Sequence, residues 1–176
     1  MTDTDFMGLV KRRYSSRAYT AEKVSDEDVM AILDAGRLAP TGVNAQHVRV
    51  IAVRSEEGLA EVGRSARIFS APLAFIVTSR PDRAWVREKF DGFNIHQIDA
   101  SIVTTQMMYE ATARGLGSVW ICFFDPETLS ESFGLEEGEV PINILAVGHR
   151  ADETSRNHGV RIPMGNSPDS LEFRYN

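Results

Sequence analysis

Residues 95–124 read IHQIDASIVTTQMMYEATARGLGSVWICFF, a long helical pattern that passes directly into a strand pattern. Within residues 95–114, apolar side chains recur at helical spacing, and Gly115 follows as a stop signal; they include Ile98, Ile102, Met107, Met108 and Ala111. They occupy more than one face, which indicates a helix buried in a core or in a subunit interface. Residues 117–124 predict a strand.

Helices and strands alternate on both sides of this stretch. Phe6, Leu9 and Val10 predict a short first helix, and Ser25 can cap a second one that Pro40 ends. Residues 57–69 are expected to be helical, and Asp125 with Pro126 begins a short helix that ends near Gly134. The remaining strands are predicted at residues 48–53, 73–77 and 142–147, so the pattern indicates a mixed α/β or α+β sheet covered by helices.

The chain has 176 residues, a formal net charge of −6 and one cysteine, Cys122. No repeat or linker divides it, so we expect one domain over residues 1–176. The acidic balance argues against binding nucleic acid or an anionic membrane through the overall field. One cysteine excludes an intramolecular disulfide and a cysteine-ligated zinc site, and we expect Cys122 to be buried and inert. No signal peptide or membrane-spanning pattern is present, so a soluble cytoplasmic protein is expected.

Three polar clusters stand out. Residues 12–17, RRYSSR, place three guanidiniums and two hydroxyls at a helix end, which suits a phosphate ester. A solvated basic face at a helix C-terminus explains the same residues. Residues 39–46, APTGVNAQ, offer the amides of Asn44 and Gln46, which can bond the edge of a heterocycle, although such residues also simply make turns. A third basic cluster, weaker as a signal, contains His149, Arg150, Arg156, His158 and Arg161.

Other chemistries find little support. Residues 115–117, GLG, lack the third glycine of a dinucleotide fingerprint, and neither a phosphate loop nor the Gly-x-Ser-x-Gly turn of a hydrolase occurs. His96 and Asp99 share a helix face, but no second ligand pair follows, so we interpret them as a hydrogen bond and predict no metal site.

Taken in order, the clusters resemble the nitroreductase family of FMN-dependent oxidoreductases. Residues 13–19, RYSSRAY, are similar to its opening Arg-x-Ser-x-Arg-x-aromatic segment, and residues 39–46 are similar to its Ala-Pro-Ser-x-x-Asn-x-Gln loop. Residues 99–121 resemble its central helix and Gly-Leu-Gly-x-x-Trp strand, and residues 147–149 resemble its Ile-Gly-Tyr turn. The resemblance covers nearly the whole chain.

The resemblance implies an α+β fold of three layers, with a central mixed, mainly antiparallel sheet flanked by helices. It also implies an intertwined homodimer with FMN at the interface. Arg13, Ser15 and Arg161 would hold the phosphate, with Tyr14 in the same segment, and Arg17 would approach the pyrimidine end of the ring. Asn44 and Gln46 would bond the ring edge or ribityl chain, and backbone near the end of the strand would lie against the ring: Trp120, Ile121 and Cys122.

The implied activity is reduction of nitroaromatics, quinones or similar electron-poor acceptors with NAD(P)H, by a ping-pong mechanism in which the flavin carries the chemistry and no side chain is catalytic. A dedicated flavin reaction (cofactor synthesis, dehalogenation or dehydrogenation) and a non-catalytic flavin-binding protein remain alternatives. The chain departs from the family pattern at His47, His149 and Gly159, where proline, tyrosine and lysine are common. Residues 80–93, with Trp85, Phe90 and Phe93, would form a lid or an exposed aromatic loop.

Overall fold

Four antiparallel strands form the central sheet of the protein, in the order β1-β2-β6-β5. They are β1 (Val48–Val53), β2 (Leu73–Ser79), β6 (Val140–Gly148) and β5 (Gly117–Ile121). The computed structural model describes residues 6–151. Because β1 and β5 are the two outer strands of this sheet, whatever they carry lies at opposite edges.

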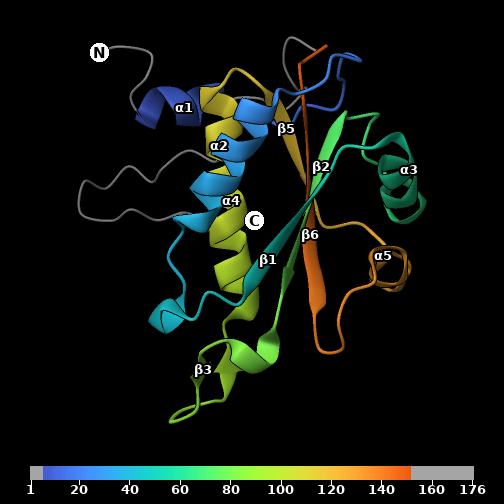
Figure 1. Ribbon diagram of the computed structural model, residues 1–176. Coiled ribbons are helices and arrows are strands. Elements are labelled where there is room, and N and C mark those ends of the chain that lie inside the picture. Colours follow the sequence, from blue (N-terminus) through green and yellow to red (C-terminus); the bar gives the residue numbers. More distant parts are fainter. Residues whose placement is uncertain (1–5, 152–176) are drawn as a thin grey trace, which may run out of the picture.

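Helices cover both faces of the sheet and make three layers (Figure 1). On one face lie α1 (Phe6–Arg12), α2 (Asp26–Arg37) and α4 (His96–Ala113), and on the other lie α3 (Glu56–Ser65) and α5 (Pro126–Phe133). The sheet alternates accordingly: Leu73 and Phe75 pack with α2 and α4, whereas Ala74 and Ile76 face α3 and α5. The expected three-layer α+β fold with a mainly antiparallel sheet is therefore confirmed.

Capping residues in the sequence mark the start of α2 and both ends of α5. The Ser25 hydroxyl accepts a hydrogen bond from the Asp28 backbone N–H, and Asp125 accepts from Glu127 and Thr128 at the start of α5. Gly134 ends α5 in the left-handed region, at φ 57°. The caps of α2 and α5 confirm the sequence-based predictions.

The structure differs from the sequence-based predictions at several places. Helix α3 ends at Ser65, four residues before the expected end, because Ala66 adopts an extended conformation and pairs with Phe124. Strand β5 ends at Ile121, so Cys122 is exposed and the prediction of a buried thiol was wrong. Met107 is fully buried in the core of its own chain, as one of the two interpretations of this helix predicted.

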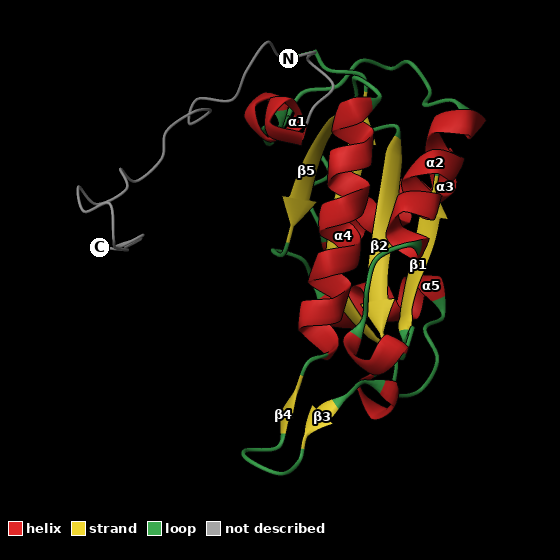
Figure 2. Cartoon of the chain, turned by 90° about the vertical axis from the view of Figure 1, so that its left-hand side faces the viewer, coloured by secondary structure: helices red, strands yellow, loops and turns green. Residues whose placement is uncertain are grey.

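Residues 80–95 contain elements that the sequence did not predict. Two short strands, β3 (Val86–Arg87) and β4 (Phe93–Asn94), pair as an antiparallel hairpin that projects beyond the main sheet (Figure 2). A 3₁₀ turn, η2 (Pro81–Arg83), leads into the hairpin, and a second, η1 (Gly42–Asn44), lies between α2 and β1. Within residues 6–151, no helix combines the length and the apolar character that crossing a bilayer demands.

Candidate functional site

The segment after α1 lies along β5. Ser15 and Ser118 form an isolated parallel bridge, and the Ser16 backbone N–H donates to the Ser118 carbonyl at 3.0 Å. Arg13 and Ser15 are half-buried and Arg17 is exposed, whereas Tyr14 is buried with the Arg150 guanidinium 4.9 Å from its ring centre. This bridge fixes the basic cluster against the outer strand of the sheet.

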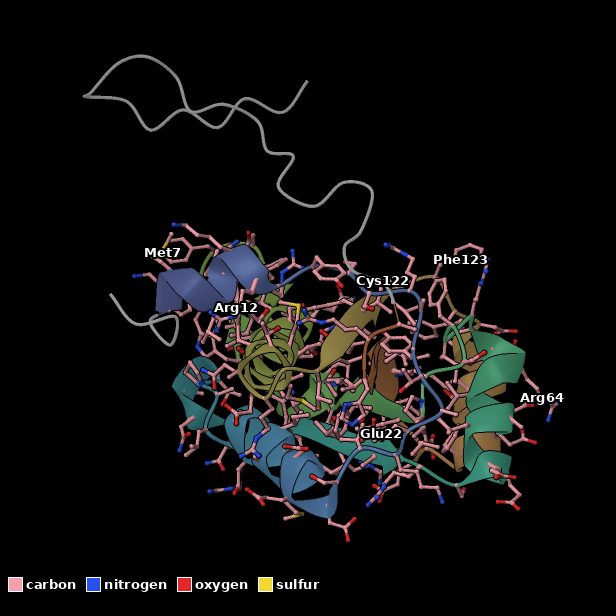
Figure 3. All side chains as sticks on the ribbon, turned by 90° about the horizontal axis from the view of Figure 1, so that it is seen from above. Met7, Arg12, Glu22, Arg64, Cys122 and Phe123 are labelled. Atoms are coloured by element: carbon pink, nitrogen blue, oxygen red, sulfur yellow. The ribbon has the colours of Figure 1, made fainter. Side chains whose placement is uncertain are left out.

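The end of β5 carries the three residues that the sequence placed against a planar ring. Trp120 is half-buried and Ile121 is buried, and the Trp120 indole N–H points at the Cys122 sulfur 3.1 Å away. Phe123 follows with 96% of its surface exposed. Seen from above, Cys122 and Phe123 lie along the same side of the molecule as Arg12 (Figure 3). The basic segment (residues 13–17) and the end of β5 (residues 120–122) therefore lie on one side of the molecule. Together they are called the β5 group.

Arg67 joins this group and was missed by the sequence analysis. The guanidiniums of Arg17 and Arg67 lie 5.9 Å and 5.0 Å from the ring centre of Phe69. All three line a groove of about 890 Å³ beside α3. The sequence analysis placed Arg67 inside an expected helix, but α3 ends at Ser65, and the Arg67 side chain lies with Arg17 beside the Phe69 ring.

Asn44 and Gln46 form a second group on the loop before β1, and both side chains are exposed. Three residues of this loop that are not glycine have positive φ: Val43 at 48°, Asn44 at 59° and Gln46 at 49°. Each such angle costs on the order of 1–3 kcal/mol and persists only where surrounding contacts impose it. The loop is therefore a strained segment that the rest of the protein holds in place.

A buried pair of side chains lies beneath this loop. His47 Nε2 is 2.9 Å from Asp99 Oδ2, and both side chains are almost wholly removed from solvent. Since a carboxylate only accepts, Nε2 carries the proton and donates it. The sequence marked His47 and Asp99 separately but did not pair them, because 52 residues separate them along the chain.

A second histidine lies at the start of α4. His96 Nδ1 is 2.9 Å from the hydroxyl oxygen of Ser79. Burial lowers the pKa of His96, and repulsion from His47 lowers it further. His96 and Asp99 therefore bond different partners, and no cluster of metal-ligating residues occurs between residues 6 and 151.

Gly42 brings the loop into contact with the hairpin. A Cβ added at Gly42 would collide with Ile95 Cδ1 and would lie 3.3 Å from Trp85 Cβ. The Ile95 backbone N–H in turn donates to the Trp85 carbonyl at 3.2 Å. The loop, the base of the hairpin and the start of α4 thus meet at Gly42, where a larger residue would require the Ile95 side chain to shift.

Within one chain, the two groups lie far apart. The loop contacts the start of α4 and precedes β1, whereas β5 is the opposite outer strand of the sheet, and the bridge of Ser15 to Ser118 lies near its start, just after the end of α4. Three interstrand spacings are about 14 Å, and the 18 residues of α4 span about 27 Å. Figure 1 shows η1 and α1 at opposite ends of α4. The expected phosphate residue Arg161, and Gly159, fall outside the described residues.

The family model for the nitroreductase family matches residues 10–69 and 59–149. A nitroreductase family protein from Clostridium difficile 630 is 40% identical, with a TM-score of 0.88 over 95% of this chain and 99% of that one. A protein from Exiguobacterium sibiricum 255-15, solved in complex with FMN, is 26% identical, with a TM-score of 0.79 over 93% and 95% of the two chains. The oxygen-insensitive NAD(P)H nitroreductase of Enterobacter cloacae is 26% identical over 85% of this chain and 90% of its own length. The chain belongs to the nitroreductase family.

Proposed function

We propose that the protein is an NAD(P)H-dependent FMN oxidoreductase that reduces nitroaromatics, quinones or similar electron-poor acceptors. The single observation that carries this proposal is the β5 group, where basic side chains and hydroxyls lie along one outer strand of the sheet. Relatives named as NAD(P)H nitroreductase and FMN reductase support it. The proposed location is the cytoplasm, where the pyridine nucleotide is supplied.

The residues present fit FMN in their chemistry. A flavin phosphate needs cationic and neutral donors, and the half-buried Arg13 and Ser15 would supply one of each, on a segment whose backbone is paired with β5 at Ser118. The redox ring needs an apolar support, which the half-buried Trp120 near the end of β5 would offer. When bound, FMN supplies the electron transfer between NAD(P)H and the acceptor.

The arginines beside Phe69 set the charge at one end of the proposed site. Arg17 would approach the pyrimidine end of the ring, and Arg67, which contacts the same Phe69 ring as Arg17, would add a second positive charge. Positive charge there favours the anionic form of the reduced ring, by the same electrostatics that lowers the pKa of an acid beside a cation. The chain's part is thus to bind, orient and bias the cofactor.

The proposed site is completed by a second copy of the chain. Asn44 and Gln46 cannot approach the β5 group of their own chain, so the loop of one protomer serves the flavin held by its partner. Helix α4 offers a surface for such a homodimer, because Ile98 is 47% exposed and lines a hollow of about 620 Å³ with Phe6, Ile102 and Tyr109. An exposed apolar hollow of this kind is typical of an interaction surface.

Purified protein tests the activity directly. The expected protein is yellow, is bleached by NADPH without oxygen, and regains its colour when a nitroaromatic is added. Arg13→Ala should weaken FMN binding at least tenfold, because it removes a charged partner of the phosphate. Lys11→Ala, which removes an exposed charge from the adjacent helix turn, is the matched control. Flavin that binds tightly but is not reduced by NAD(P)H would refute the reductase.

Sedimentation tests the shared site. Ile98→Asp should convert the dimer into monomer and weaken FMN binding together, whereas Met30→Asp, at an exposed methionine of α2, should change neither. A wild-type holo-protein that sediments as a monomer would contradict the shared site.

A further inference from the structure

One carboxylate on α4 contacts both ends of the strained loop before β1, and the His47 carbonyl also accepts a hydrogen bond from the Arg80 backbone N–H at 3.2 Å. The backbone N–H of Gly42 donates to both oxygens of Asp99, at 3.2 Å and 3.1 Å. His47, at the other end of the loop, donates to the same carboxylate at 2.9 Å. Asp99 therefore binds the first and the last residue of the 42–47 segment at once, and fixes the distance between them.

Inside the loop, hydrogen bonds are only short-range. Gln46 N–H donates to the Thr41 hydroxyl at 3.0 Å, and Asn44 N–H donates to the Thr41 carbonyl at 2.9 Å. Neither bond links the loop to another element. Among the hydrogen bonds described for residues 42–47, the contacts to Asp99 are those that tie the loop to α4.

We propose that His47 and Asp99 are positioning residues, a buried clamp that holds the left-handed loop so that Asn44 and Gln46 are presented to the flavin. The identity of the ligand, a flavin, rests on the proposed function. The restraint of the loop rests only on the contacts of Asp99 with Gly42 and His47. With the clamp closed, the two exposed amides occupy a fixed place relative to α4. With the clamp open, the strained angles relax and the amides lose that place.

A different buried contact on the same helix separates positioning from general stability. The Thr104 hydroxyl is fully buried, one turn and a half further along α4, and contacts Asn143 on β6 at 3.1 Å. It joins the helix to the sheet but does not touch the loop. Thr104→Val therefore removes a buried polar contact of α4 while the clamp stays intact.

The test compares amide hydrogen exchange of residues 42–46 in the apoprotein with FMN affinity and with the visible circular dichroism of bound FMN. His47→Leu and Asp99→Asn should speed loop exchange and weaken FMN binding by about tenfold or more each, since hydrogen bonds to charged groups are lost. Both variants should also change the dichroism of bound flavin. His47→Gln, whose amide can donate to Asp99, should restore part of both effects. Thr104→Val should lower the melting temperature and leave loop exchange and dichroism as in the wild type.

Each outcome is informative. Loop exchange that stays at the wild-type rate in Asp99→Asn, or that rises equally in Thr104→Val, would overturn the clamp. If His47→Leu fails to fold, Asp99→Asn and His47→Gln carry the comparison. A wild-type chain that does not bind FMN would refute the proposed function. The effect of the clamp on loop exchange would still be tested, because exchange is measured without cofactor.

Discussion

The two ends of helix α4 are tied to the rest of the chain in the same chemical way but in opposite surroundings. At its start, Asp99 accepts from His47 in a site that is almost dry. At its end, Arg114 reaches Asp28 of α2 at 2.8 Å and Glu110 of its own helix at 2.9 Å, with about a quarter of each side chain of the Arg114–Asp28 pair exposed.

The two pairs therefore have different roles: the buried pair fixes the position of a loop, and the half-exposed pair links two helices. Burying a charged group costs several kcal/mol in desolvation, so a buried pair is a poor source of stability, and its removal on one side is expensive. A half-exposed pair costs little and contributes little. The buried His47–Asp99 pair also bonds a strained loop. The half-exposed Arg114–Asp28 pair joins two helices that apolar residues already pack together, among them Ile32 and Met107.

The largest effect is expected at the buried end. Asp99→Ala should lower the free energy of unfolding by about 3–5 kcal/mol, because His47 and the Gly42 N–H lose their common acceptor inside the protein. Urea denaturation measures this loss. A loss below about 1 kcal/mol, the range of an exposed pair, would remove the contrast between the two ends.

A smaller effect is expected at the half-exposed end. Asp28→Ala should cost about 1 kcal/mol, since it deletes the bonds to Ser25 and Arg114 but leaves Arg114 paired with Glu110. The same denaturation assay applies, with FMN affinity as a second readout that should stay unchanged. Weakened flavin binding in this variant would show that the end of α4 also positions the site.

The smallest effect is a difference in acid response. Burial lowers the pKa of His96 below its ordinary 6.5, so the unfolded chain takes up a proton that the folded chain resists, and stability should fall as the pH drops from about 6.5. His96→Gln should reduce this fall. The Ser25 hydroxyl, followed by Arg114, lowers the pKa of Asp28 below 3.8, so its contribution is present above that pH and is lost only as the pH falls further. An NMR titration of the His96 ring with a midpoint above 6.5 would contradict the lowered pKa of His96.

Much of the fold follows from local patterns. The apolar repeat of α4, the serine and aspartate caps and the β-branched strands each carry their information within a few residues, so those elements were predicted nearly to their ends. Errors arose where a helix ends without a glycine, as α3 does at Ser65, or where a strand ends in apolar residues, as at Cys122 and Phe123. Side-chain type alone does not announce either feature.

The candidate site was less predictable because it depends on distance. Residue types marked the basic cluster and the family resemblance assigned Arg13, Ser15 and Arg17, but neither could show that Asn44 and Gln46 lie at the other edge of the sheet. Arg67 and the pairing of His47 with Asp99 were also out of reach, since both arise from segments that meet only in three dimensions.

The close fit at Gly42 also limits how this protein can be engineered. Trp85 and Ile95 lie against Gly42, so changes at either residue also act on the neighbouring loop that carries Asn44 and Gln46. The tip of the hairpin, where Phe90 is 78% exposed, is not among the contacts at Gly42. Substitutions at the tip should therefore leave this loop in place.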